Sequence, residues 1–245
     1  SRIFATPFDI AAGPLARFHS LTLADDDHVV LLTAHHLIVD GWSVELLKSH
    51  LRQALEQAAH NGSIDLGARP LQYEDIAVYE ATVERAARRE RALAQRVERL
   101  AGTRNLELDV AKPRPATMSS RGRTHEFTLP AGLVEQLKAL AAAEGATFYM
   151  AMLALYQVLL ARHSTQRDFV IGTPVANRDT SGAEDVVGNF VNMVAMRSQL
   201  ADNPSFRELL SRSRETALDA FSSQNVPFVD IVKALALPRV ANTSP

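Results

Sequence analysis

The chain lacks cysteine altogether and is poor in aromatic residues and in residues that break regular structure. Its 245 residues include no Cys, 6% aromatic residues, 11 Gly and 11 Pro. The absence of cysteine excludes disulfides, thiolate nucleophiles and zinc sites built on cysteine, and it is compatible with a reducing compartment. The low Gly and Pro content excludes a collagen-like or low-complexity chain. We therefore expect a globular protein with a cytoplasmic location.

Neither an excess of one charge nor a long apolar run is present. The formal net charge is −2, from 26 basic and 28 acidic residues, so no overall field favours nucleic acid or an anionic membrane. The most apolar stretch, 148–160, is interrupted by Gln157 and is shorter than the ~20 residues that cross a bilayer. No basic segment followed by an apolar run opens the chain, so no signal peptide is visible. We expect neither nucleic acid nor a membrane as a partner.

Strand-like and helix-like segments interleave along the chain, which predicts an α/β fold. Residues 15–23 and 28–35 are apolar segments separated by an acidic turn, and they predict a hairpin whose second strand is covered on both faces. A helix capped by Ser43 should follow and end near Asn61-Gly62. The apolar spacing then predicts one helix over 74–100.

A linker is expected near the middle of the chain, because residues 112–122 combine two prolines with a small polar tail. Further strands and helices should follow it, with Pro at the first turn of the helix over 204–223. In order, they are a strand over 123–129, a helix over 130–144, a buried helix over 147–162, a strand over 168–172, a loop over 173–187, a strand over 193–200 and helices over 204–223 and 227–237.

One face of the helix expected over 74–100 is rich in arginine. Acidic residues occur on the same helix in equal number, which is typical of a solvated face crossed by salt bridges. A surface that binds nucleic acid needs unbalanced positive charge. The arginines are Arg85, Arg88, Arg89, Arg91, Arg96 and Arg99.

The strongest candidate for chemistry lies where the second strand gives way to a helix. Side chains alternate along a strand, so His35 and His36 should point in opposite directions, and only one can face a channel while the other packs. Such a pair is a poor chelate for a metal ion. We therefore expect no metal at this position.

Asp40 follows the two histidines and has two open roles. It could accept a proton from an imidazole, as in a catalytic triad, or pair with an arginine to brace the loop, for which Arg178 is a candidate. Bracing is favoured. Gly41 should supply the positive φ that a tight turn requires. Because the chain has no Gly-x-Ser-x-Gly sequence and no Cys, no covalent nucleophile is evident, and the histidine would act directly on a substrate.

The grouping His-His-x-x-x-Asp-Gly-Trp-Ser over residues 35–43 resembles the active-site motif of condensation domains of nonribosomal peptide synthetases, in the chloramphenicol-acetyltransferase-like superfamily. Other segments resemble further motifs of that family in collinear order. They are residues 8–10, 13–15, 73–79, 170–178 and 187–197. The segments 223–228 and 238–242 depart from the family pattern.

The resemblance implies which residues act. The second histidine of the motif, here His36, is the functional one in that family, and Asp40 and Gly41 complete the catalytic set. The backbone N–H of Gly41, near a helix start, is a candidate to stabilise an oxyanion. The supporting residues are His35, Trp42, Ser43, Arg178 and Asn192.

The resemblance also implies an architecture of two chloramphenicol-acetyltransferase-like lobes in a V-shaped pseudo-dimer, with the active site in a tunnel between them. By analogy, residues 1–112 are the later part of an N-terminal lobe, 113–122 a linker and 123–245 the earlier part of a C-terminal lobe. Both lobes are then incomplete, because family members extend beyond both ends. We expect an isolated chain of this length to be poorly soluble or inactive.

The implied reaction is amide formation. The α-amine of an aminoacyl thioester on an acceptor carrier domain attacks the thioester of a donor chain on another carrier domain. Phosphopantetheine arms deliver both substrates, the domain itself binds no cofactor, and an adenylation domain is adjacent.

Other readings of the motif stay open. A related acyltransferase or an epimerisation domain would use the same histidine, although the segment 188–192 favours condensation over epimerisation by resemblance. A catalytically silent domain that recruits a tailoring enzyme is a different class. A metal-dependent hydrolase is the most remote alternative.

Overall fold

The computed structural model describes residues 6–108 and 122–237, so the expected linker lies almost entirely outside the described residues. The chain divides into two compact units, which are described separately below. Unit 1 comprises Ser1–Ala86 and Ala176–Val191, and unit 2 comprises Ala87–Val175 and Asn192–Pro245. The segment 176–191 thus packs with the first part of the chain.

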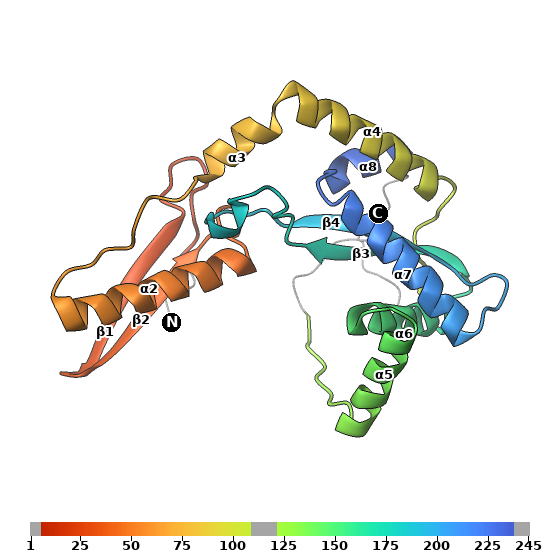
Figure 1. Ribbon diagram of the computed structural model, residues 1–245, viewed down its shortest axis with the longest axis horizontal. Coiled ribbons are helices and arrows are strands. Elements are labelled where there is room, and N and C mark those ends of the chain that lie inside the picture. Colours follow the sequence, from red (N-terminus) through yellow and green to blue (C-terminus); the bar gives the residue numbers. More distant parts are fainter. Residues whose placement is uncertain (1–5, 109–121, 238–245) are drawn as a thin grey trace. The chain divides into compact units, whose positions relative to one another are not determined.

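Unit 1 contains the expected hairpin (Figure 1). β1 (Ala16–Ala24) and β2 (Asp27–Ala34) pair antiparallel, with Ala16 opposite Ala34. α2 (Gly41–Asn61) lies beside them, and the hairpin and the helix line a common groove. β2 is not covered on both faces as expected, since its residues are half-buried or exposed. The physical reason is that, within the described ranges, this sheet consists of two strands only.

The start of α2 differs from the expected one. Asp40, not Ser43, is the N-cap residue, and its side chain accepts a hydrogen bond from the Ser43 N–H. An aspartate three residues before a free N–H satisfies one of the unpaired donors of the first turn, and that contact decides where the helix begins. The helix ends as expected, with Gly62 in the left-handed conformation at φ 67.

The helix expected over 74–100 is divided in two. α3 (Tyr73–Glu80) and α4 (Val83–Leu100) are separated at Ala81 and Thr82. The Ala86 N–H bonds to the Thr82 C=O, so a new helix starts at a residue type that favours helix N-termini. The apolar spacing continues across this break and therefore could not reveal it.

Unit 2 is built on a second antiparallel pair, β3 (Asp168–Val175) and β4 (Asn192–Gln199), with Asp168 opposite Gln199. β3 continues beyond its expected end at Gly172, and the loop that follows contains the short helix η1 (Ala183–Asp185). No strand forms over 123–129, because these residues pair with no other strand in the part of the chain that the structure describes.

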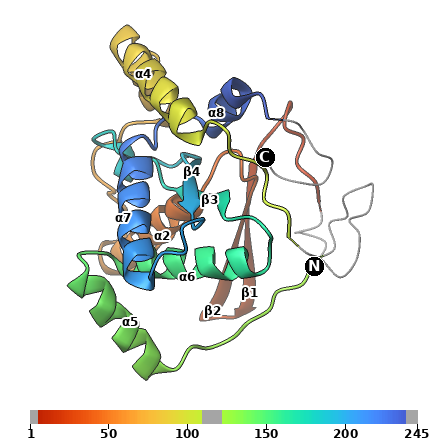
Figure 2. The same ribbon diagram turned by 90° about the vertical axis from the view of Figure 1, so that its right-hand side faces the viewer.

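Besides most of α4, unit 2 contains four helices near their expected positions. They are α5 (Ala131–Ala143), α6 (Phe148–Arg162), α7 (Phe206–Ser222) and α8 (Phe228–Leu235). α6 packs on α5 and α7, and α7 packs on β4 (Figure 2). The core includes the fully buried Phe169, Met196 and Leu210. Pro204 precedes the N-cap residue Ser205 and so lies outside the first turn of α7.

Two expectations about burial in unit 2 are wrong in part. α6 is buried on one face only, with Tyr156 50% exposed, whereas Gln157 is buried and accepts a hydrogen bond from the Ser213 hydroxyl. Arg96 is not solvated, since its guanidinium is buried and bonds to Asp219 and to the Ala195 C=O. A buried charge is tolerated when it is paired and hydrogen-bonded in this way.

Among the described residues, no single helix combines the length and the apolar composition of a membrane span. α5 and α6 meet those criteria only as a pair, and their axes are bent by 105°.

Candidate active site

The two histidines follow β2 on a turn rather than within the strand. The Ile38 N–H donates to the His35 C=O at 3.1 Å and closes the turn. The His35 ring is held, because its Nδ1 accepts from the Leu37 N–H at 3.1 Å and it packs edge-on against Phe8. His36 is exposed, and within the described ranges its ring has no hydrogen-bond or ion-pair partner. One histidine is therefore packed and the other is accessible to solvent.

Asp40 forms a buried ion pair with Arg178. The two side chains are 1% and 4% exposed, and both carboxylate oxygens lie 3.0 Å from Nη2 of the arginine. The carboxylate also accepts from the Ser43 N–H at 2.8 Å and the Phe190 N–H at 3.2 Å. In the described part of the chain its donors include no imidazole, so the geometry is that of a brace and not of a catalytic triad.

The surroundings of Asp40 favour its charged form. Burial by itself raises the pKa of this carboxyl, but hydrogen bonds from Ser43, Phe190 and Arg178 act in the opposite direction. Their combined effect holds the pKa of Asp40 below its ordinary value of 3.8. The carboxylate is therefore ionised at neutral pH, and Arg178 compensates its charge.

Arg178 also fixes the loop between β3 and β4. Its Nη1 donates to the Ala183 C=O at 2.6 Å and to the Val186 C=O at 2.7 Å. The guanidinium carbon lies 4.3 Å from the ring centroid of Phe190 and 5.8 Å from that of Trp42. A planar cation with five donors can serve all these contacts at once, which a lysine cannot do.

Ser43 connects the first turn of α2 to the same loop. It is fully buried, and its Oγ accepts from the Gly188 N–H at 2.9 Å. The same oxygen lies 2.7 Å from Asp40 Oδ1 and 2.8 Å from the Gly188 C=O, and its single proton is donated to one of them at a time. The Trp42 indole N–H adds a bond to the Glu184 C=O at 2.8 Å.

Gly41 does not have the conformation expected of it. It is the first residue of α2 and is absent from the residues with positive φ. The extended backbone of Asp40, with φ −116 and ψ −179, makes the entry into the helix instead. A Cβ at Gly41 would meet nothing within 4 Å, so the start of the helix is open on that side.

Asn192 lies in unit 2, at the first residue of β4. Its Nδ2 donates to the Gln224 C=O at 2.7 Å and to the Val226 C=O at 2.6 Å, and its Oδ1 accepts from the Phe228 N–H at 3.2 Å. All these bonds hold the segment before α8.

Sequence reasoning missed two residues that contact the motif and its loop. The Nδ2 of Asn189 donates to the His36 C=O at 2.8 Å, and no signal in the sequence indicated this contact. Tyr73 packs so closely on Gly188 that an added Cβ would lie 2.3 Å from its Cδ2. Gly188 lies in a segment that resembles a family motif, and a glycine there was the one sign in the sequence that another side chain packs closely.

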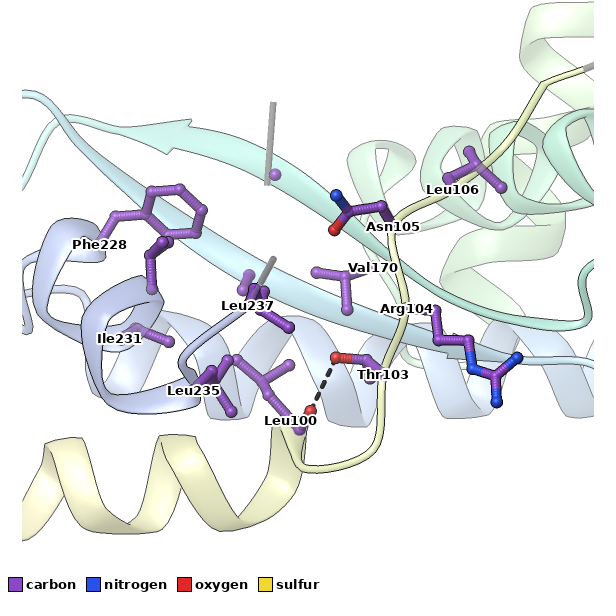
Figure 3. Close-up of a pocket in the computed structure, with 13 residues that line it drawn as sticks. Leu100, Thr103, Arg104, Asn105, Leu106, Val170, Phe228, Ile231, Leu235 and Leu237 are labelled. Atoms are coloured by element: carbon purple, nitrogen blue, oxygen red, sulfur yellow. Dashed lines mark hydrogen bonds between the residues drawn. The ribbon is translucent and has the colours of Figure 1, made fainter. Parts of the chain in front are cut away.

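The pocket in Figure 3 is a separate feature of unit 2. Its volume is about 220 Å³, and its lining is mostly apolar, with Val170, Phe228 and Ile231 among the residues. The Thr103 hydroxyl in its wall donates to the Leu100 C=O at 2.7 Å (Figure 3). No residue expected at the site lines this pocket.

Fold and motif together define an α/β protein built like a condensation domain. The family model described as Condensation domain matches residues 2–245, and the chain belongs to this family. It is 39% identical over 240 residues to a linear gramicidin synthase protein of Brevibacillus parabrevis, covering 98% of this chain and 3% of that protein. It is 38% identical to phosphinothricin tripeptide synthetase PhsC of Streptomyces viridochromogenes, covering 98% of this chain and 22% of the relative.

The fold is also found among solved structures. The X-domain from teicoplanin biosynthesis is similar with a TM-score of 0.87 and 26% identity, covering 100% of this chain and 56% of that one. A further structure is a complex of that X-domain with OxyB. The chain thus spans a small part of its curated relatives and about half of this structural neighbour.

Proposed function

We propose that this chain forms amide bonds in nonribosomal peptide synthesis, as part of a condensation domain within a larger synthetase. The observation that carries the proposal is the exposed His36, placed on a turn that a buried ion pair braces, within the motif of the family. The similarity to proteins named as gramicidin and phosphinothricin tripeptide synthetases supports it.

The substrates are a donor acyl or peptidyl thioester and an acceptor aminoacyl thioester, each on the phosphopantetheine arm of a carrier domain. The partners are these two carrier domains and an adjacent adenylation domain. We further propose that residues 1–112 and 123–245 belong to two chloramphenicol-acetyltransferase-like lobes with the site in a tunnel between them. The domain itself binds no cofactor.

The chemistry is limited by positioning more than by proton removal. An α-amine has a pKa of about 7.7 to 8.0, so an appreciable fraction is already nucleophilic at neutral pH. Holding two tethered reactants in line contributes on the order of 7 to 11 kcal/mol. A general base contributes about 10²- to 10⁴-fold, or roughly 3 to 5 kcal/mol. In the reaction the C–N bond forms and the donor C–S bond breaks. The proton that the amine loses passes to the leaving sulfur, which departs as the free thiol of the donor arm.

Each motif residue has a role in this reaction. The His36 ring orients the attacking amine and takes up the proton that it releases. The Gly41 N–H stabilises the oxyanion, because it lies at the positive end of α2 and has no acceptor among the described residues. Asp40 and Arg178 keep the turn in place, and His35, Trp42 and Ser43 hold the backbone around it. Asn192, the last supporting residue, holds the segment before α8 in unit 2.

The test is His36→Ala in the full-length protein, with both carrier domains loaded. Amide formation should fall by about 10²-fold or more, in line with the loss of positioning and proton transfer, while binding of the carriers persists. His163→Ala is the matched control, because this exposed ring has no hydrogen-bond partner in the described part of the chain. Unchanged turnover in His36→Ala would remove His36 from the chemistry.

A second candidate function is recruitment of a partner enzyme without catalysis. The likeness to the X-domain, which another structure shows in complex with OxyB, favours it. It predicts that the wild-type protein binds a partner and forms no amide with loaded carriers. The accessible His36 favours catalysis over this reading.

A further inference from the structure

We propose that Asn189 is a positioning residue that sets the orientation of His36 for the reaction, an inference that rests on the proposed function. Its Nδ2 donates to the backbone C=O of His36 at 2.8 Å, from a loop 153 positions away. Within the described ranges the His36 ring has no hydrogen-bond partner. The Cα–Cβ bond from which the ring extends is therefore directed by the backbone, and Asn189 holds that backbone.

Both peptide groups that flank His36 are fixed. The preceding group is held through the His35 C=O, which accepts from the Ile38 N–H at 3.1 Å. The following group is held at both ends, since the His36 C=O accepts from Asn189 and the Leu37 N–H donates to the His35 ring. With both planes fixed, φ and ψ of His36 are fixed, and so is the direction of its Cα–Cβ bond.

The amide of Asn189 can serve this purpose in one orientation only. Its Oδ1 accepts from the Val191 N–H at 3.3 Å while its Nδ2 donates to the His36 C=O. Turning the amide over would place its NH₂ against an N–H and its oxygen against a carbonyl. The two contacts together make Asn189 a donor toward His36.

The backbone around Asn189 is anchored on the elements that carry the motif. The Gly188 N–H bonds to the buried Ser43, and the Phe190 N–H bonds to the buried Asp40 at 3.2 Å. The Asn189 C=O itself accepts from the Tyr73 hydroxyl at 3.3 Å. The Asn189 side chain therefore extends from a backbone that is itself held in place. A residue that positions a catalytic group such as His36 needs this support.

Loss of this hydrogen bond should affect turnover and not substrate binding. A misplacement of about 1 Å at a reacting group can cost about 10²-fold in rate. Since Asn189 contacts the backbone of His36 and not the reactants in this arrangement, the acceptor KM should change little.

The experiment compares three variants of the full-length protein with loaded carriers. Asn189→Asp keeps the size and the oxygen that Val191 uses, but it removes the donor and places an oxygen against the His36 carbonyl. We expect kcat to fall about tenfold to hundredfold, with the acceptor KM within about twofold. Asn189→Gln keeps the donor and should recover most of the rate. Asn203→Asp, an exposed asparagine with no side-chain hydrogen bond among the described residues, is the matched control and should equal wild type.

A second readout does not depend on activity. In protein labelled at histidine, the ring NMR signals of His36, assigned with His36→Ala, should shift or broaden in Asn189→Asp, while those of His163 stay unchanged. The proposal is overturned if kcat is unaffected, if the rate falls only in proportion to a lowered Tm, or if the His36 signals do not move. If the wild-type protein forms no amide, the proposed function fails, and the ring signals alone then decide the role of Asn189.

Discussion

The residue on which the site depends most is Asp40, a carboxylate removed from solvent. It is 2% exposed, and its charge is balanced by Arg178 and by hydrogen bonds from Ser43 and Phe190. A buried charge stripped of its partner is strongly unfavourable, whereas the intact pair contributes modestly to stability. Removal of one partner is therefore the informative change.

Asp40→Ala should lower the free energy of unfolding by about 3 to 5 kcal/mol, because the guanidinium of Arg178 stays buried without its carboxylate. Denaturant unfolding monitored by circular dichroism measures this loss. Glu184→Ala is the control, since this exposed carboxylate has no ion pair within the described ranges and should change stability by less than about 0.5 kcal/mol. Equal effects of the two substitutions would contradict the brace.

The same carboxylate predicts a dependence of stability on pH. The pKa of Asp40 in the folded protein lies below 3.8, so the unfolded state binds its proton first as the pH falls. The stabilisation is present above about pH 4 and is lost as the pH falls through the folded pKa. The difference in unfolding free energy between wild type and Asp40→Asn should be constant from about pH 5 to 7 and shrink below about pH 4. If this difference in unfolding free energy stays constant down to about pH 2, the pKa of Asp40 is not lowered in the folded protein.

At the scale of elements, the turn after β2, the start of α2 and the loop before β4 act as one clamp. Gly188 is its tightest point, because a Cβ there would lie 2.3 Å from Tyr73 Cδ2 and 3.1 Å from Phe190 Cε2. The aromatic rings of Tyr73 and Phe190 contact each other at 5.0 Å between centroids. A side chain at position 188 would have to separate these parts.

Gly188→Ala should therefore destabilise the protein by about 1 to 3 kcal/mol, as expected of overpacking. Gly132→Ala, in α5 with nothing within 4 Å of the added Cβ, is the control and should be neutral or stabilising by up to about 1 kcal/mol. Thermal unfolding of both variants measures these changes in stability. The double variant Gly188→Ala, Tyr73→Ala should lose less stability than the sum of the two single variants, since removal of the Tyr73 ring relieves the clash. If the two losses are fully additive, Gly188 and Tyr73 do not pack as the structure shows.

Local signals located most elements, and contacts between elements decided the rest. The hairpin, the end of α2 at Gly62 and the helices α5 to α8 follow from turn residues, caps and apolar spacing. The break between α3 and α4 and the burial of Arg96 do not, because spacing describes one helix and not its neighbours. The strand expected over 123–129 has β-like composition but finds no partner to pair with in the described part of the chain.

For the molecule as a whole, the motif was visible in the sequence, and its supports were visible only in part. Residues 35–43 are contiguous, so their grouping could be read directly. Arg178 was one candidate partner for a lone carboxylate, and the structure pairs the two. Asn189 contacts His36 from 153 positions away, and the packing of the segment 176–191 in unit 1 could not be derived from local patterns.

The last prediction concerns the behaviour of the 245-residue chain by itself. The groove between the hairpin and α2 has a volume of about 490 Å³, and Phe18, Val30 and Leu51 along it are 66%, 45% and 41% exposed. Contiguous apolar surface next to open strand edges promotes association.

The chain should bind a hydrophobic dye and elute as associated species whose size grows with concentration. Phe18→Ser combined with Leu51→Gln should shift it toward the monomer, whereas Leu133→Gln, 52% exposed but outside the groove, should not. A chain that stays monomeric at every concentration and binds no dye would show that the groove between the hairpin and α2 does not cause association.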